Sequence, residues 1–144
     1  SGRPGTTAES SGWSAADAVL RYSHAKLPAD RLTVSSDGGG CLPVFSSQGE
    51  MESMSTGSSH TLLETLRQLS QQGLKLDEIL PFFTSNVAQL MRFARKGSIA
   101  QGMDADLVVL SDKLEVQHVM AGGCWHIKNG EQQILGSFEA EYLN

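Results

Sequence analysis

The sequence has few of the features that mark secreted, membrane or nucleic-acid-binding proteins. Its 144 residues include only 2 cysteines, Cys41 and Cys124, which form no metal or redox motif. No apolar run approaches the roughly 20 residues that span a bilayer. Positive charge is also scarce, because 11 Lys and Arg against 16 Asp and Glu give a net charge of −5. We therefore expect no nucleic-acid partner, no membrane contact and a reducing, cytoplasmic setting.

The amino-terminal residues lack the pattern of a signal peptide. Residues 1–12 are polar and Gly-rich, and the chain starts with Ser and not with Met. Such a start suits a processed product or a piece of a longer chain. With 40% hydrophobic and 19% charged residues, the composition is that of an ordinary globular protein.

The spacing of apolar residues predicts an α/β portion followed by a small antiparallel β portion, divided near residue 95. Helices are expected over residues 14–26, 59–72, 76–80 and 86–92. Ser14 and Asp17 predict a capping box at the start of the first helix. One face of the second helix is predicted to be core and carries Leu62, Leu63, Leu66 and Leu69. Strands are expected over residues 31–36, 105–110, 116–121, 124–128 and 133–135, with a hairpin turn at Asn129-Gly130. The Gly- and Ser-rich residues 38–58 are predicted to form a long loop without regular structure.

Asp37 is the strongest candidate for a catalytic residue. It follows the predicted strand 31–36 and precedes three glycines, Gly38 to Gly40. A carboxylate at the carboxyl end of a strand is held firmly, and glycines allow a ligand to approach the backbone closely. The alternative is a simple turn, because Asp-Gly marks turns in many proteins.

The other potential metal ligands show no ligand spacing. The 4 histidines form neither HxH nor HExxH, so surface or packing roles are expected for His24, His60, His118 and His126. Asp104 and Asp106 lie where a strand begins. We expect these two carboxylates to serve turn geometry and solubility.

Several motifs in this order resemble one enzyme superfamily. The motifs are SSDGGG at 35–40, SHTLLETLRQL at 59–69, TSNVA at 84–88, KGSI at 96–99, GMDADLVV at 102–109 and VMAGGCWHIKNGEQQILGSFE at 119–139. Together, residues 14–140 resemble the carboxyl-terminal third of the amidohydrolase superfamily. Within it, they are most similar to the isoaspartyl (β-aspartyl) dipeptidase family.

This resemblance implies a fold. Members of the superfamily are metal-dependent hydrolases built on a (β/α)₈ TIM barrel with a small β-sandwich. Residues 1–95 would be the carboxyl-terminal part of the barrel, with 31–36 as its last strand. Residues 96–144 would be part of the sandwich domain, whose other half would come from chain upstream of Ser1.

The resemblance also implies a chemistry. One or two divalent metals, typically zinc in a binuclear site, would supply a hydroxide that cleaves a β-aspartyl dipeptide. Asp37 would be both a metal ligand and the proton shuttle. Cys41 stands where the family usually has a Ser that holds the substrate carboxylate, and a thiol is a weaker donor. A nucleophilic role for Cys41 is disfavoured, because no His lies near it in the sequence.

The remaining metal ligands implied by the resemblance would lie upstream of Ser1. We therefore expect the chain alone to be inactive and poorly folded before residue 95. The resemblance also implies that the full-length protein is a homo-oligomer. Two alternatives stay open. One is another amidohydrolase, similar to dihydropyrimidinases or deacetylases, and the other is a non-catalytic interaction module that uses the β portion.

Overall fold

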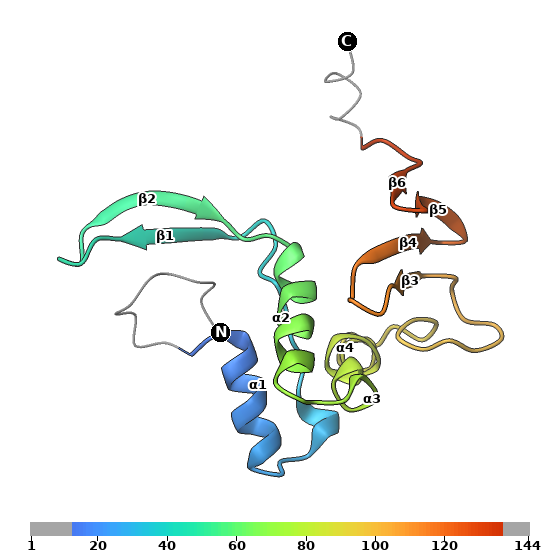
Figure 1. The fold of residues 1–144 in the computed structure, drawn as a ribbon, viewed down its shortest axis with the longest axis horizontal. Coiled ribbons are helices and arrows are strands. Elements are labelled where there is room, and N and C mark those ends of the chain that lie inside the picture. Colours follow the sequence, from blue (N-terminus) through green and yellow to red (C-terminus); the bar gives the residue numbers. More distant parts are fainter. Residues whose placement is uncertain (1–12, 137–144) are drawn as a thin grey trace. The chain divides into compact units, whose positions relative to one another are not determined.

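The computed structural model describes residues 13–136 and divides into two compact units between Arg92 and Phe93. The first unit contains α1 (Ala15–His24), η1 (Ala29–Arg31), β1 (Cys41–Phe45), β2 (Met51–Thr56), α2 (His60–Gln71), α3 (Leu76–Ile79), η2 (Leu80–Phe83) and α4 (Ser85–Leu90). The second contains β3 (Leu107–Leu110), β4 (Val116–Ala121), β5 (Cys124–Lys128) and β6 (Glu131–Gln132) (Figure 1). No helix in this part of the chain has the length and apolar character needed to cross a membrane.

Helix α1 begins as the sequence predicts. The Ser14 hydroxyl accepts a hydrogen bond from the Asp17 N–H at 3.0 Å, and the Asp17 carboxylate accepts one from the Ser14 N–H at 3.4 Å. This capping box satisfies two N–H groups that the first turn would leave without partners. The helix buries Ala16 and Val19 and ends near Lys26, which has a left-handed backbone with φ of 52°.

The core of the first unit is formed mainly by α2 and the short helices that follow it. Of the four leucines predicted to form the apolar face of α2, Leu66 and Leu69 are buried, whereas Leu62 and Leu63 are half-buried. Ile79 and Phe82 are buried as well, at the end of α3 and within η2. Full burial of each such side chain contributes about 1.5–3 kcal/mol, so this small cluster stabilises the helical part of the unit.

Residues 31–36 do not form the predicted strand. Ala29–Arg31 is a 3-10 turn, and the chain then runs without assigned strand structure to Asp37. Leu32 is extended, with φ −100° and ψ 132°, and the Val34 N–H donates to the Phe82 carbonyl at 3.0 Å. A parallel strand needs neighbouring strands for its backbone groups, and the described residues supply none beside this segment.

The predicted loop 38–58 contains a β-hairpin instead. Strands β1 and β2 pair in an antiparallel, two-stranded sheet, drawn as a ribbon in Figure 1. The connection is closed by a hydrogen bond from the Ser46 N–H to the Glu50 carbonyl, and Gly49 adopts the left-handed φ of 85° that the turn requires. Exposed apolar side chains remain on this hairpin, among them Phe45, Met51 and Met54.

The second unit is a four-stranded antiparallel sheet in the order β3-β4-β5-β6. Asn129 and Gly130 have φ of 54° and 79°, which confirms the predicted type I′ turn. The last strand was expected over 133–135, but it lies directly after the turn, at Glu131–Gln132. Because the turn is tight, β6 pairs with β5 directly after it, and Lys128 lies opposite Glu131. Residues 137–144, the end of the predicted β portion, lie outside the described residues.

Asn86 of α4 offers a direct test of how the first unit is held together. Its buried side-chain amide donates to the carbonyls of Ala29 at 2.7 Å and Leu32 at 2.8 Å. Asn86→Ala removes both hydrogen bonds and leaves two carbonyls without this donor, so we expect a loss of roughly 1–3 kcal/mol. Thermal and urea unfolding of the intact protein that carries this chain measures the loss. The control is Gln89→Ala, which removes an exposed amide from the same helix; an equal effect of both variants contradicts the account.

Candidate active site around Asp37

Asp37 lies at a tight turn between the extended segment and the hairpin. Its backbone is left-handed, with φ of 51°, a conformation that Asp tolerates better than most residues. The Asp37 carbonyl accepts from the Gly40 N–H at 2.9 Å, and the Ser36 hydroxyl accepts from the Gly38 N–H at 3.1 Å. The carboxylate belongs to an exposed residue and is available to a ligand.

The described residues do not make a metal site by themselves. Within 13–136, no group of three or more His, Cys, Asp or Glu side chains could hold a metal ion. Asp37 is chemically suited to be one ligand, but a zinc site needs three or four. Cys41, the first residue of β1, is an exposed free thiol, as is Cys124 on β5.

The histidines are dispersed over the two units. His24 ends α1 and His60 begins α2. On the sheet, the His118 ring lies 5.6 Å from the ring of Trp125, and its Nδ1 accepts from the Asn129 N–H at 3.2 Å. His126 lies on β5. These positions agree with packing and surface roles.

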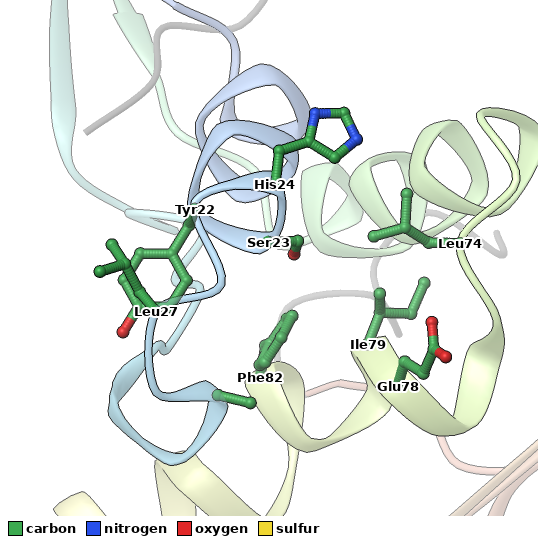
Figure 2. Close-up of a pocket in the computed structure, with 9 residues that line it drawn as sticks. Tyr22, Ser23, His24, Leu27, Leu74, Glu78, Ile79 and Phe82 are labelled. Carbon is green, nitrogen blue, oxygen red and sulfur yellow. The ribbon is translucent and has the colours of Figure 1, made fainter.

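A pocket of about 330 Å³ lies in the first unit, between the end of α1 and the helices α3 and η2. Figure 2 shows Phe82 and Ile79 among its lining side chains, with the His24 ring turned away from Phe82. Neither Asp37 nor any residue of the hairpin lines this pocket. It therefore does not belong to the candidate site around Asp37.

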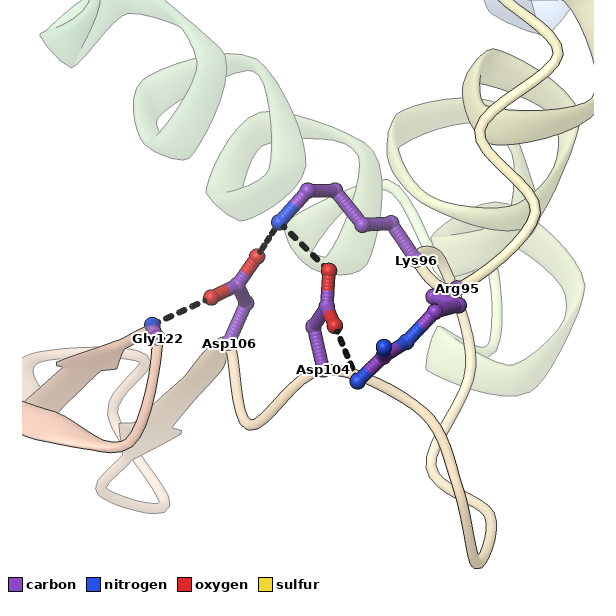
Figure 3. A network of polar contacts seen from close by, with 5 residues as sticks. All are labelled: Arg95, Lys96, Asp104, Asp106 and Gly122. Carbon is purple, nitrogen blue, oxygen red and sulfur yellow. Dashed lines mark hydrogen bonds and ion pairs between the residues drawn. The ribbon is translucent and has the colours of Figure 1, made fainter.

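Asp104 and Asp106 are paired with cations of the same unit (Figure 3). Arg95 lies 2.9 Å from the Asp104 carboxylate, and the Lys96 ammonium contacts both carboxylates. Asp106 also accepts from the Gly122 N–H at 2.7 Å. Asp106 thus links the segment before β3 to the β4–β5 turn, and Asp104 pairs with Arg95 and Lys96 within that segment.

These contacts shift two pKa values. The Gly122 N–H lowers the pKa of Asp106 below its ordinary value, and Lys96 lowers it further. The pKa of Lys96 is raised above its ordinary value, most by the hydrogen bond to Asp106 and next by the hydrogen bond to Asp104. Both groups stay charged near neutral pH, which suits a structural ion-pair cluster.

Sequence reasoning missed three contributors to these arrangements. Lys96 had a signal, since a basic residue ten positions before Asp106 could face the Asp-x-Asp pair. The sequence signal for Gly40 and Gly57 was weaker. Gly40 was seen only as part of a glycine run, and Gly57 was placed in a loop. Their close approach to Asp37 depends on the pairing of β1 with β2, which the sequence analysis did not predict.

Comparison with known proteins decides the family. The sequence pattern of the amidohydrolase family matches residues 10–125. The chain belongs to the amidohydrolase family. Its mixed α/β structure is that of a portion of the TIM-barrel fold followed by a portion of a small β domain.

Three solved structures are similar to this chain in fold. A β-aspartyl dipeptidase from Fervidobacterium islandicum AW-1, in complex with β-Asp-Leu dipeptide, is 32% identical over 87% of this chain, with a TM-score of 0.76. A second structure of β-aspartyl dipeptidase from that organism is 29% identical over 88%, with a TM-score of 0.71. N-acetylglucosamine-6-phosphate deacetylase from Pasteurella multocida, 19% identical over 82% with a TM-score of 0.62, shares the fold. The chain spans about a third of each structure, 33%, 31% and 35% respectively.

The Asp106 contacts give a pH-dependent prediction. Because the folded-state pKa of Asp106 lies below its ordinary value of 3.8, its charge stabilises the fold above that pH, and the contribution is lost as the pH falls through the folded-state pKa. Asp106→Ala should therefore lower the thermal midpoint of the intact protein slightly at pH 7, and the difference from wild type should vanish in acid. Asp112→Ala, which removes an exposed carboxylate from the same unit, is the control. A difference that persists unchanged in strong acid contradicts the pairing.

Proposed function

We propose that the intact protein containing this chain is a metal-dependent dipeptidase that cleaves β-aspartyl dipeptides. The observation that carries the proposal is the exposed carboxylate of Asp37, held at a turn in a chain that is similar over 87% of its length to a β-aspartyl dipeptidase with bound β-Asp-Leu. Membership in a family of hydrolases is consistent with this activity.

Asp37 is the proposed catalytic residue. Its carboxylate would take a proton from the attacking water and deliver it to the leaving amine. A carboxylate at a fixed position suits both transfers, because it can accept and return a proton within hydrogen-bond distance. The turn places the carboxylate beside Gly40, where an added Cβ would lie 2.6 Å from Oδ1.

We propose zinc, in a binuclear site, as the metal. When bound, it would activate water and polarise the scissile carbonyl. Asp37 would be one ligand, and the others would lie upstream of Ser1, as the family resemblance implies. The described residues form no group of ligands of their own.

Cys41 is proposed to contact the substrate. It is exposed at the start of the hairpin, four positions after Asp37. A thiol donates a weaker hydrogen bond than a hydroxyl, so Cys41 would hold a substrate carboxylate less firmly than a Ser would.

The same proposal covers the organisation of the intact protein. Residues 1–95 would complete a TIM barrel and residues 96–144 a β-sandwich, whose other strands would cover exposed apolar residues of the sheet such as Val108 and Trp125. We also propose a homo-oligomer that acts in the cytoplasm on small peptides, without nucleic-acid or membrane partners.

The experiment is hydrolysis of β-Asp-Leu by the intact, zinc-loaded protein. We expect turnover that chelation abolishes and that Asp37→Asn lowers by roughly 10²–10⁴-fold, the usual contribution of a general acid–base group. Asp30→Asn, which changes an exposed carboxylate of η1, should leave the rate unchanged.

Dihydrouracil is the comparison substrate. Turnover of dihydrouracil but not of β-Asp-Leu would reassign the enzyme to a dihydropyrimidinase-like activity. If Asp37→Asn hydrolyses β-Asp-Leu as fast as wild type, the role of Asp37 is wrong.

A further inference from the structure

Two glycines face each other at the base of the hairpin, next to Asp37. The Gly57 N–H donates to the Gly40 carbonyl at 2.9 Å, and the Gly57 carbonyl accepts from the Gly39 N–H at 2.9 Å. The Gly40 N–H in turn donates to the Asp37 carbonyl at 2.9 Å. These bonds extend the β1–β2 pairing up to the turn that carries the carboxylate.

Asp37 occupies the space that side chains at 40 and 57 would need. A Cβ at position 40 would lie 2.6 Å from Asp37 Oδ1 and 2.7 Å from its Cγ and Oδ2. A Cβ at position 57 would lie 2.1 Å from the Asp37 carbonyl oxygen. All of these distances are far below van der Waals contact.

The requirement at these two positions is for space and not for backbone conformation. Gly40 and Gly57 are absent from the described glycines with positive φ. By contrast, Gly39 and Gly49 have φ of 82° and 85°, and a Cβ at either would meet no atom within 4 Å. Gly39 and Gly49 are therefore needed for their backbone conformation, whereas Gly40 and Gly57 are needed because a side chain there would collide with Asp37.

We propose that Gly40 and Gly57 are positioning residues for Asp37. Gly40 leaves room for the carboxylate in its present orientation, and Gly57 lets the end of the hairpin pass against the Asp37 backbone. The hairpin β1–β2, which follows Asp37 in the sequence, therefore helps to set the position of the Asp37 carboxylate. This inference rests on the proposed function, since it assigns these glycines to the same reaction.

Gly40→Ala in the intact, zinc-loaded protein is the primary test. The added methyl group meets a flexible side chain, so the fold should persist while the carboxylate turns away. Because misplacement by about 1 Å can cost roughly 10²-fold, we expect kcat for β-Asp-Leu to fall by about that factor. KM should change much less, since Asp37 acts on the proton transfers.

Gly49→Ala is the matched control. It places a methyl group in the same hairpin and strains a left-handed glycine, but it contacts nothing near Asp37. We expect it to lower the thermal midpoint at least as much as Gly40→Ala while kcat stays within about twofold of wild type, well short of the loss expected from misplacement. If Gly40→Ala keeps the wild-type kcat, or if Gly49→Ala loses as much, the inference is overturned.

Crystal structures of the Gly40→Ala and Gly57→Ala variants test the inference independently of activity. We expect the Asp37 carboxylate to move by on the order of 1 Å in the first, because nonbonded atoms need roughly 3.5 Å. An unmoved carboxylate overturns the inference whatever the enzyme cleaves. Absence of β-Asp-Leu turnover by wild type would instead refute the proposed function, and the displacement would still decide the role of the glycines. If Gly57→Ala does not fold, Gly40→Ala alone decides it.

Discussion

Among the described residues, no strand lies beside the segment that leads to Asp37, so its backbone hydrogen bonds go to other elements of the first unit. Asn86 donates to the carbonyls of Ala29 and Leu32, and the Phe82 carbonyl accepts from the Val34 N–H. A buried polar group that lacks a partner costs about 1–3 kcal/mol. These three bonds therefore hold the segment against η2 and α4, and through it they fix where the turn at Asp37 begins.

Local rules predicted the elements whose stability is local. The capping box at Ser14 and Asp17 marks the start of α1, and the type I′ turn at Asn129 and Gly130 joins β5 to β6. In both cases a few neighbouring side chains determine the backbone. The leucine stripe of α2 likewise identified Leu66 and Leu69 as core.

Elements that depend on distant partners were predicted less well. The β-branched Thr33 and Val34 favour a strand over residues 31–36. A parallel strand forms only where neighbouring strands bond to its backbone, and such strands are not among the described residues. The hairpin β1–β2 was missed because its Ser and Gly content indicates a loop. At the candidate site, Asp37 was identified from its position before three glycines. The roles of Gly40 and Gly57 follow only from pairing across the hairpin.

The central claim is that this chain supplies one carboxylate to a metal site whose other ligands lie elsewhere in the protein. Metal content after dialysis tests it most directly, measured for the intact protein and for the 144-residue chain at equal concentration. We expect bound zinc in the intact protein, a loss of zinc in its Asp37→Ala variant and no retained zinc in the chain alone. Stoichiometric zinc on the isolated chain that Asp37→Ala removes would contradict it, because the chain would then hold a complete site by itself.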